Sequence, residues 1–502
     1  MRSRTGIASL ALAAALSLVM AGPTSAGPFT VGPLNVISGP SPFASCSIAG
    51  QTGTNFLNSE VEPWVEVNPT DPNNVIAVWQ QDRWSNGGAR GLVTAATHDG
   101  GATWSTTFAH FSTCSGGTAA NGGNYERASD PWVSFAPNGD AYQISLSVNL
   151  FQDPATAILV SKSVDGGDTW SEPVTLVRDT SGVAPFLFDD KESITADPTD
   201  PDFVYAIWDR LRFPSDSANF NAQHAFSFRG DIVFSRTTDG GETWEPARTI
   251  FEPQKNQATI GHQIVVQPDG DLFDFFTLFQ GSGNNAPGAS LAYITSSDHG
   301  ATWSAPTVIR KIRFIGAFDP DTGLPIRAEG FVPEVAVDPS TGNLFIAWQD
   351  TMFNGVDQIA FTMSTNDALT WSAPIKVSQT PPNADVANEQ AWVQAVHVAN
   401  GTIAVTYYDF RNNTTAPGVP TDYWMVHCHS SCADVASWGD EARLTNTSFD
   451  IEQAPFARGP NGFFLGEYEG LSSAGNTFWT LFAIVNNGTP NNRTDIGVRT
   501  AG

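Results

Sequence analysis

Residues 97–104 read Thr97-His-Asp99-Gly-Gly101-Ala-Thr103-Trp104, and the same octapeptide pattern returns further along the chain. Good copies occupy 163–170, 237–244 and 296–303, and a fifth copy at 364–371 has Asn366 in place of the aspartate and Ala368 in place of the second glycine. The copies follow one another at intervals of roughly 60 to 75 residues, which is typical of one supersecondary unit repeated within a domain.

Each repeat predicts four short strands. In the first repeat they are expected at 64–67, 75–80 and 91–96 and directly after Trp104. A turn rich in Pro, Asp and Asn joins the first two strands at 68–74, and the third repeat carries a similar turn at 197–202. Such turns between β-rich segments, without sustained helical periodicity, favour antiparallel meanders. Radially repeated four-stranded sheets are propeller blades, so the sequence predicts an all-β fold, a β-propeller.

The octapeptide resembles the Asp-box, or bacterial neuraminidase repeat (BNR), of the sialidase-like β-propellers. The resemblance extends over nearly all of the chain after residue 26. It implies that the boxes are structural turns between the third and fourth strands of a blade and lie away from the active site. Their Asp and Ser/Thr side chains can bond the turn backbone, and the Trp can pack beneath it.

The repeats favour seven blades, with six, the usual number in sialidases, as the alternative. First strands are expected to begin near Trp64, Trp132, Ser193, Gln263, Glu334, Trp392 and Ala454. The last unit ends at 495–500 without a box or a fourth strand, whereas 32–37 is similar to the fourth strands at 305–309 and 373–377. An N-terminal strand is therefore expected to close the ring, since closure removes exposed sheet edges.

The first residues predict secretion. Arg2 and Arg4 precede an apolar stretch, and small residues follow at 24–26, which is the pattern of a signal peptide spanning 1–26. The remaining 27–502 are expected to form one propeller domain. A formal net charge of −27 argues against nucleic acid and anionic membrane as partners. A secreted, extracellular monomer that acts on carbohydrate is the expectation.

Four cysteines in an exported chain predict two disulfides. We expect the pairs Cys46–Cys114 and Cys428–Cys432. The alternative is a metal site formed by the segment 427–432, but strand alternation would separate its histidines from Cys428. We predict no cofactor and no catalytic metal; a structural Ca²⁺ stays open without assigned ligands.

Three repeats place an arginine at matching points after the second strand: Arg83, which follows Asp82, and Arg210 and Arg411. Guanidinium groups bind carboxylates bidentately, and the resemblance to sialidases implies an arginine triad that holds the substrate carboxylate. The alternative is that each arginine pairs with its own neighbouring aspartate and stabilises a turn. No Arg-Ile-Pro motif, which marks the first triad arginine in typical sialidases, occurs near the first blade.

Acidic residues recur where the first strands begin: Glu62, Asp130, Glu192, Glu389 and Glu452, with Lys191 beside one of them. Such carboxylates could line the mouth of the propeller and serve in acid–base catalysis or cation binding. Ordinary polarity at strand edges is the alternative.

Tyr468 lies in the segment Gly466-Glu-Tyr-Glu-Gly470 and matches Tyr407 of the preceding unit. Sialidases use a Tyr nucleophile assisted by Glu, so the resemblance implies Tyr468 as nucleophile. Glu467, Glu469 and Glu452 are candidates for its activating base, with Glu452 favoured by strand alternation. We list Asp82 as a further catalytic candidate.

The leading hypothesis is a secreted sialidase-like glycoside hydrolase that acts on terminal acidic sugars. One alternative is a non-catalytic propeller that binds glycan or protein. The other is a hydrolase of a neutral polysaccharide with paired carboxylates. Arginines that converge on one site with Tyr and Glu would favour the sialidase-like hydrolase. Carboxylates that lie together while the arginines lie apart would favour the hydrolase of a neutral polysaccharide.

Overall fold

The protein is described from a computed structural model that covers residues 29–150, 154–182, 184–216, 229–281, 288–457 and 462–502. The predicted signal peptide at 1–26 lies outside these residues. The described chain is all-β, and its few helical turns are short 3₁₀ segments. These are η1 (Thr113–Ser115), η2 (Val386–Glu389), η3 (Val435–Ser437) and η4 (Ile451–Gln453). Within the described ranges no helix is long and apolar enough to cross a membrane.

The strands follow one another in antiparallel groups of four along the chain. The first groups are β2 (Glu60–Val67), β3 (Val75–Arg83), β4 (Ala89–Thr97), β5 (Ser105–Thr107); β6 (Arg127–Phe135), β7 (Ala141–Asn149), β8 (Ala155–Ser163), β9 (Val174–Thr180); and β10 (Phe186–Ala196), β11 (Val204–Phe213), β12 (Arg229–Thr237), β13 (Arg248–Phe251). Next come β14 (Gln257–Val266), β15 (Leu272–Gln280), β16 (Gly288–Ser296), β17 (Thr307–Ile312); β18 (Glu334–Val337), β19 (Leu344–Asp350), β20 (Gln358–Ser364), β21 (Ile375–Lys376); and β22 (Ala391–Ala399), β23 (Thr402–Asp409), β24 (Pro420–Cys428), β25 (Gly439–Arg443).

The final group combines both ends of the chain. β29 (Gly470–Ala474), β30 (Thr477–Val485) and β31 (Thr494–Ala501) are joined by β1 (Asn35–Val36), which pairs antiparallel with β31. The short β26 (Phe449–Asp450) pairs with β24, and β27 (Phe456–Ala457) pairs with β28 (Gly462–Phe463). The N-terminal segment thus completes the last group, as its resemblance to a fourth strand predicts.

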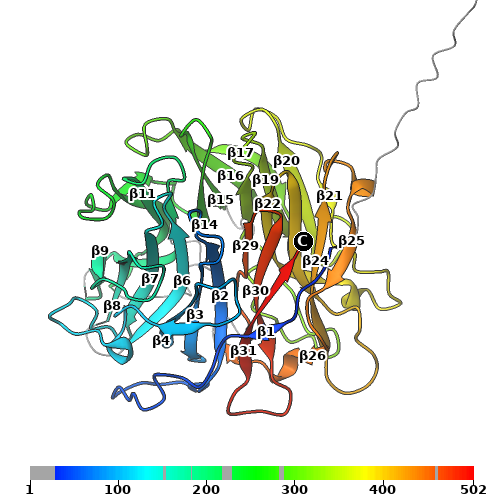
Figure 1. The fold of residues 1–502 in the computed structure, drawn as a ribbon, viewed down its shortest axis with the longest axis horizontal. Helices are drawn as coiled ribbons and strands as arrows, with labels where there is room; N and C mark the ends of the chain where they lie inside the picture. Colours follow the sequence, from blue (N-terminus) through cyan, green and yellow to red (C-terminus); the bar gives the residue numbers. More distant parts are fainter. Residues whose placement is uncertain (1–28, 151–153, 183, 217–228, 282–287, 458–461) are drawn as a thin grey trace, which may run out of the picture.

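The first strands of successive groups lie against one another. β2 contacts β6, and the contacts continue through β10, β14, β18, β22 and β29, which contacts β2 again. Figure 1 shows β2, β22 and β29 near the middle of the molecule and β9 and β25 at its edge. Side chains at the ends of these first strands can therefore meet although they are far apart in sequence.

One strand expectation is wrong. The first strand of the last unit does not begin near Ala454, which follows η4, but at Gly470 on β29. Tyr468 consequently precedes a first strand, whereas Tyr407 lies on the second strand β23, so the two tyrosines are not equivalent. The extra hairpin of β27 and β28 between the last two groups shifts the repeat, and its short strands carry no sequence signal that marks them as an insertion.

The Asp-box turns have the structure that the motif predicts. Between β4 and β5, the Gly101 amide donates to Thr97 Oγ1 at 2.9 Å, and Asp99 accepts from the Thr103 amide at 2.9 Å and from its hydroxyl at 2.6 Å. Gly100 and Gly101 have φ of 69° and 87°, a region that glycine adopts without strain. The boxes at 163, 237 and 296 repeat these bonds.

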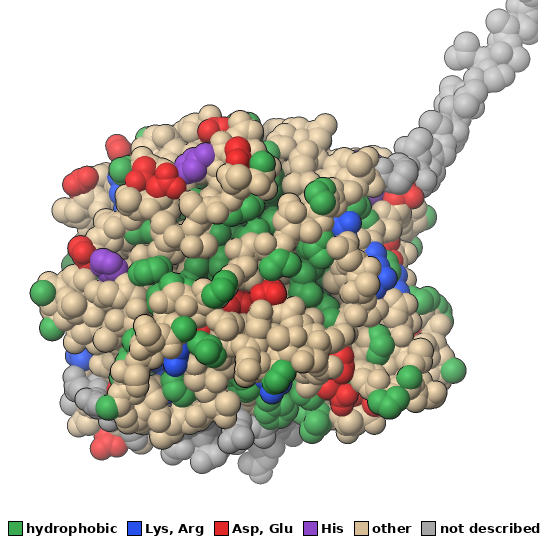
Figure 2. Space-filling model, turned by 60° about the horizontal axis from the view of Figure 1, so that its bottom comes forward, with side chains coloured by type: hydrophobic (Ala, Val, Ile, Leu, Met, Phe, Trp, Pro, Cys, Tyr) green, Lys and Arg blue, Asp and Glu red, His purple; other side chains and the backbone are tan. Residues whose placement is uncertain are grey.

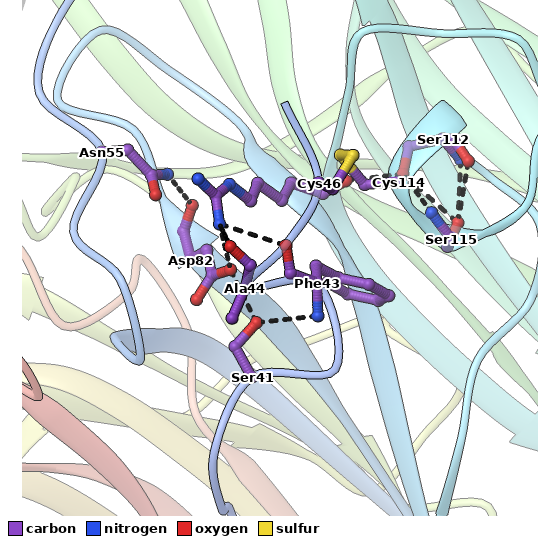
Figure 3. Close-up of a disulfide and its surroundings, with 10 residues drawn as sticks. Ser41, Phe43, Ala44, Cys46, Asn55, Asp82, Ser112, Cys114 and Ser115 are labelled. Atoms are coloured by element: carbon purple, nitrogen blue, oxygen red, sulfur yellow. Dashed lines mark hydrogen bonds and ion pairs between the residues drawn. A yellow bond between two sulfur atoms is a disulfide. The ribbon is translucent and has the colours of Figure 1, made fainter. Parts of the chain in front are cut away.

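Both predicted disulfides are confirmed. Cys46 is bonded to Cys114, and Cys428 to Cys432, so the latter pair does not serve as metal ligands. Figure 3 shows the first bridge, which ties the N-terminal segment to η1 next to the first group of strands.

Candidate functional site

Three charged residues occupy the same irregular point on neighbouring first strands. The pairing register of β2, β6 and β10 shifts there, and the residues in the bulges include Glu62, Asp130 and Lys191. Their φ angles are 53°, 52° and 52°, a left-handed conformation that is uncommon for residues other than glycine. At the corresponding bulge of β14 the residue is Gly261. Such strained backbone clusters at functional sites and re-aims side chains.

These side chains meet in a charged cluster, which we define as Glu62, Asp130, Lys191, Arg327, Glu329 and Glu467. The Lys191 ammonium contacts Glu467 and lies 3.7 Å from Glu329 Oε2 and 3.9 Å from Asp130 Oδ2. Arg327 Nε lies 2.6 Å from Glu467 Oε1. The two cations thus share Glu467, and their charge is compensated within the cluster.

Glu62 is the protonated member of the cluster at neutral pH. Its side chain is buried and accepts a hydrogen bond from Gln80 Nε2. Burial, followed by the negative charge of Asp130, raises the pKa of Glu62 to about 8. The carboxyl therefore keeps a proton that it can donate.

Asp130 behaves in the opposite way, although burial by itself would raise its pKa. The positive charge of Lys191 and hydrogen bonds from Ser129 and Glu62 lower the pKa of Asp130 below its ordinary value. Ser129 Oγ donates to Asp130 Oδ1 at 2.8 Å. Two interacting carboxyl groups whose pKa values are driven apart are the arrangement from which acid and base roles arise.

Arg83 and Tyr468 border this cluster. Arg83 donates to Gln80 Oε1 at 2.6 Å and lies over the Phe464 ring at 4.5 Å, and burial lowers its pKa to about 10. The Tyr468 hydroxyl donates to the backbone oxygen of Pro131 at 3.2 Å. Burial and the nearby charge of Glu62 raise the pKa of Tyr468 well above its ordinary value. The phenol is therefore neutral and already engaged by backbone.

The other two predicted arginines pair with carboxylates on nearby strands. Arg210 Nε lies 2.7 Å from Asp189 Oδ1, and its NH2 lies 3.0 Å from Asp179. Arg411 contacts Glu441 and lies 2.5 Å from Asp409 Oδ2. Among the described residues, the carboxylates that Arg210 and Arg411 contact lie outside the charged cluster.

Asp82 also has hydrogen-bond partners of its own outside the charged cluster. Its carboxylate accepts from Ser41 Oγ at 2.6 Å (Figure 3). It also accepts from the Asn58 amide at 2.8 Å, and Arg90 lies 3.4 Å away. These bonds hold the N-terminal segment against β3. Asp82 therefore has a structural explanation although it precedes Arg83.

The remaining predicted acids divide between two places. Glu192 is buried next to Asp130, and burial raises its pKa well above the ordinary value. Glu389 accepts from Asn354 and Asn383, and Glu452 lies on η4 near Asp319. The first thus belongs beside the charged cluster, whereas the last two lie on the short helical segments η2 and η4.

Two members of the charged cluster are missed by the sequence analysis. Arg327 and Glu329 come from the long connection between β17 and β18, where no repeat motif places them. The unusual length of this connection could have singled it out, because long loops in repeat folds often serve function. Glu62-Pro63 and Asp130-Pro131 carry a further signal, since proline within a strand marks a bulge.

Within the described ranges no group of three or more His, Cys, Asp or Glu residues is arranged to hold a metal ion. The face in Figure 2 shows acidic side chains in separate small groups with few Lys and Arg between them. The groups available for chemistry in the charged cluster are therefore its carboxyl groups and the cations Lys191 and Arg327.

Comparisons with known proteins place these features in a family context. Residues 230–373 match the model of the BNR repeat-like domain. The comparison with curated proteins gives no match.

Among solved structures, a Penicillium chrysogenum alpha-L-arabinanase complexed with arabinobiose is 14% identical with a TM-score of 0.46, over 75% of this chain and 94% of that chain. A Hadza microbial sialidase is 14% identical with a TM-score of 0.46, over 85% and 73% of the two chains. The Fusarium graminearum alpha-L-arabinofuranosidase ARB93A is 11% identical with a TM-score of 0.41, over 88% and 92%. Residues 230–373 thus match the BNR repeat-like model, and the box turns at 97–104 and 163–170 extend the same pattern outside the matched residues.

Proposed function

We propose that the protein is a glycoside hydrolase whose catalytic centre is the charged cluster and whose substrate is a sugar without a carboxylate. The observation that carries this proposal is the Glu62–Asp130 pair on neighbouring bulges, where burial raises the pKa of Glu62 and Lys191 lowers that of Asp130. Glycoside hydrolysis needs such a proton donor together with an ionised carboxylate. The resemblance to sialidase-like propellers adds carbohydrate as the substrate class.

Each residue has a role in this proposal. Glu62 donates its proton to the oxygen of the leaving group, and Asp130 stabilises the positive charge that develops on the sugar. Glu329 lies 3.7 Å from the Lys191 ammonium and is the candidate that activates water. Lys191 keeps Asp130 ionised, because a nearby opposite charge favours the charged form.

The state of the cations favours a substrate without a carboxylate. Lys191 and Arg327 both bind Glu467, so neither offers an unpaired charge to an anion. Arg210 and Arg411 are paired elsewhere. Of the three arginines predicted to hold a substrate carboxylate, only Arg83 borders the charged cluster. This separation favours the hydrolase of neutral polysaccharide among the alternatives.

A sialidase-type hydrolase is the second candidate, and one observation favours it. Arg83, Tyr468 and Glu62 influence one another electrostatically in the same buried region. The substitution Tyr468→Phe separates the two candidates. A neutral-sugar hydrolase should keep its kcat within a few-fold, whereas loss of a nucleophile should lower kcat far more than binding.

The test is a panel of chromogenic glycosides that includes sialosides, pentosides and hexosides. We expect turnover of an uncharged glycoside and a loss of about 10²- to 10⁴-fold in kcat for Glu62→Gln, the usual contribution of general acid catalysis. Asp165→Asn in a box turn is the matched carboxylate control and should keep its activity. Turnover of sialosides alone, or full activity of Glu62→Gln, would contradict the proposal.

We also propose that the groups of strands form a closed seven-bladed propeller. The continuous contacts among first strands and the pairing of Val36 with Gly497 support it. Deleting residues 27–40 should lower the melting temperature strongly, since a sheet edge and its packing are lost. An unchanged melting temperature would contradict closure.

Secretion and a monomeric state complete the proposal. The pattern at 1–26 favours export and cleavage before Gly27. N-terminal sequencing of protein from the culture medium tests the cleavage point, and sedimentation of the same material tests the monomer.

A further inference from the structure

Gln80 is a buried amide that joins the two carboxyl groups assigned to catalysis. It lies on β3, and its side chain is fully buried. Its Nε2 group donates to Glu62 Oε2 and, at 3.0 Å, to Ser129 Oγ. The Ser129 hydroxyl in turn donates to Asp130 Oδ1 at 2.8 Å. These four residues form a hydrogen-bonded ring, which closes where Glu62 donates to Asp130.

The orientation of the Gln80 amide follows from Arg83. Arg83 NH1 donates to Gln80 Oε1 at 2.6 Å, and a guanidinium group has no acceptor. The hydrogen-bond network decides which end of an amide is oxygen. The oxygen of Gln80 therefore faces Arg83, and its two N–H groups face the hydrogen-bonded ring.

The amide sets the direction of every hydrogen bond in the ring. Because an NH2 group only donates, Glu62 and Ser129 both meet Gln80 with a lone pair. The Ser129 hydrogen is then free to point to Asp130. The proton of Glu62 lies on the oxygen that faces Asp130, since the other oxygen accepts from Gln80. Asp130 thus accepts two hydrogen bonds, which favour its ionised form.

We propose that Gln80, held by Arg83, is a positioning residue that directs the Glu62 proton and the Ser129 hydroxyl towards Asp130. This inference rests on the proposed function, because the ring contains its proton donor and its ionised carboxylate. Gln80 needs no contact with the substrate, since it acts through Glu62 and Asp130. Arg83 acts one step further away, by orienting the amide.

A purely structural role for the amide is the alternative, and the next residue of β3 has such a role. Gln81 is buried, donates to Glu60 Oε1 at 2.5 Å and accepts from Trp79 Nε1 at 3.0 Å. Gln81 therefore holds one carboxyl group of β2 that lies outside the charged cluster, whereas Gln80 joins two carboxyl groups within it. The pair supplies a variant and its matched control.

The experiment is an infrared titration of the carboxyl groups in Gln80→Met and in Gln81→Met. Subtracting the spectrum of the same protein with Glu62→Gln or Asp130→Asn isolates each group. We expect Gln80→Met to raise the pKa of both groups by about one unit. Ionised Glu62 loses a donor, and the proton of Glu62 is no longer confined to the oxygen that faces Asp130. Gln81→Met should leave both values in place, and unchanged values in Gln80→Met or equal shifts in the two variants would overturn the inference.

Ser129→Ala tests the ring if Gln80→Met does not fold. It removes only the hydroxyl that donates to Asp130 and should raise the pKa of Asp130, whereas an unchanged pKa would overturn the inference. Other charged or titratable groups face the ring and are the same in every variant, so the shifts report the ring itself. They are residues 190–192 of β10, Asp209 of β11, Arg327 and Glu329 between β17 and β18, and residues 467–469 before β29.

Turnover gives a second readout. On the glycoside identified in the screen, both limits of the pH profile of kcat/KM should move to higher pH in Gln80→Met and stay in place in Gln81→Met. A lower kcat with an unchanged pH profile would show a structural role and overturn the inference. The infrared shifts need no turnover, so shifts without hydrolysis of any glycoside would support the ring and contradict the proposed function. Hydrolysis without the shifts would do the reverse.

Discussion

The aspartates of the box turns and the acids of the inner bulges are the same chemical group in opposite circumstances. Asp99 in the first box is exposed, and its oxygens accept from the Thr103 amide and hydroxyl and from Thr97. These hydrogen bonds lower its pKa to about 2. Glu62 and Asp209 are buried, Asp209 has no donor among the described residues, and the pKa values of both are raised.

The difference separates acids that fold the protein from acids that remain available for chemistry. A box carboxylate is already satisfied by the turn it closes, so nothing is left for a substrate. An unsatisfied buried carboxyl lowers the stability of the folded state, and such groups concentrate at functional sites. The box aspartates, which belong to the most conspicuous motif, are therefore not the carboxylates that are available for catalysis.

The largest effect expected is that of removing the cation from the charged cluster. Lys191→Met should lower the free energy of unfolding by about 3–5 kcal/mol, because it leaves Asp130 buried without its counter-charge and leaves Glu467 and Glu329 with Arg327 alone. Urea unfolding at neutral pH measures it. A matched lysine, Lys162, lies 2.8 Å from Asp140 outside the cluster, and Lys162→Met should cost no more than about 1 kcal/mol. Equal losses would remove the contrast between the two regions.

The two regions should also respond to pH in opposite directions. Burial raises the pKa of Glu334 from its ordinary value of 4.5 to about 8, so its contribution to stability is complete below pH 4.5 and is lost as the pH rises towards 8. The pKa of Asp99 falls from 3.8 to about 2, so its contribution is present above pH 3.8 and is lost as the pH falls towards 2.

Melting temperatures measured from pH 2 to pH 9 should therefore peak near pH 4 to 5, between these two windows. Glu334→Gln should flatten the alkaline side and leave the acid side unchanged. A variant that flattens neither side would show that the raised pKa of this buried carboxyl does not contribute to the profile.

The smallest effect is expected at a single box. Asp165→Ala removes acceptors for the Thr169 amide and for the Ser163 hydroxyl and should cost about 1–2 kcal/mol. Activity on the glycoside identified in the screen should stay unchanged, as measured by kcat/KM. A loss of activity without loss of fold would assign the boxes a role that the structure does not give them.

Repeats and local chemistry could be predicted from the sequence. The box turns and the positions of most strands follow from motifs whose hydrogen bonds are local. Both disulfides follow from the four cysteines of the chain, and the pairing of the N-terminal segment with the C-terminal strand follows from the fourth strand that the last repeat lacks. Glu62 and Asp130 could be found as well, because their place at the start of first strands repeats along the chain.

Contacts between side chains that lie far apart in the sequence could not be predicted. Arg210 and Arg411 occupy equivalent places in their repeats, but only the folded structure shows that Asp189 and Glu441 neutralise them. Arg327 reaches Glu467 from a connection 140 residues away in sequence, and no periodicity reports such a contact. The position of the bulge in each first strand determines which side chains point into the charged cluster, and the sequence pattern does not give this position.

The most direct test of the account is the infrared absorption of carboxyl groups at pH 7 in the native protein, in Glu62→Gln and in Asp165→Asn. The account predicts a band from protonated carboxyl groups in the native protein, because the pKa of Glu62 is about 8. That band should weaken in Glu62→Gln and stay unchanged in Asp165→Asn. Absence of the protonated band from the native protein, or an identical band in Glu62→Gln, would contradict the claim that Glu62 holds the proton for catalysis.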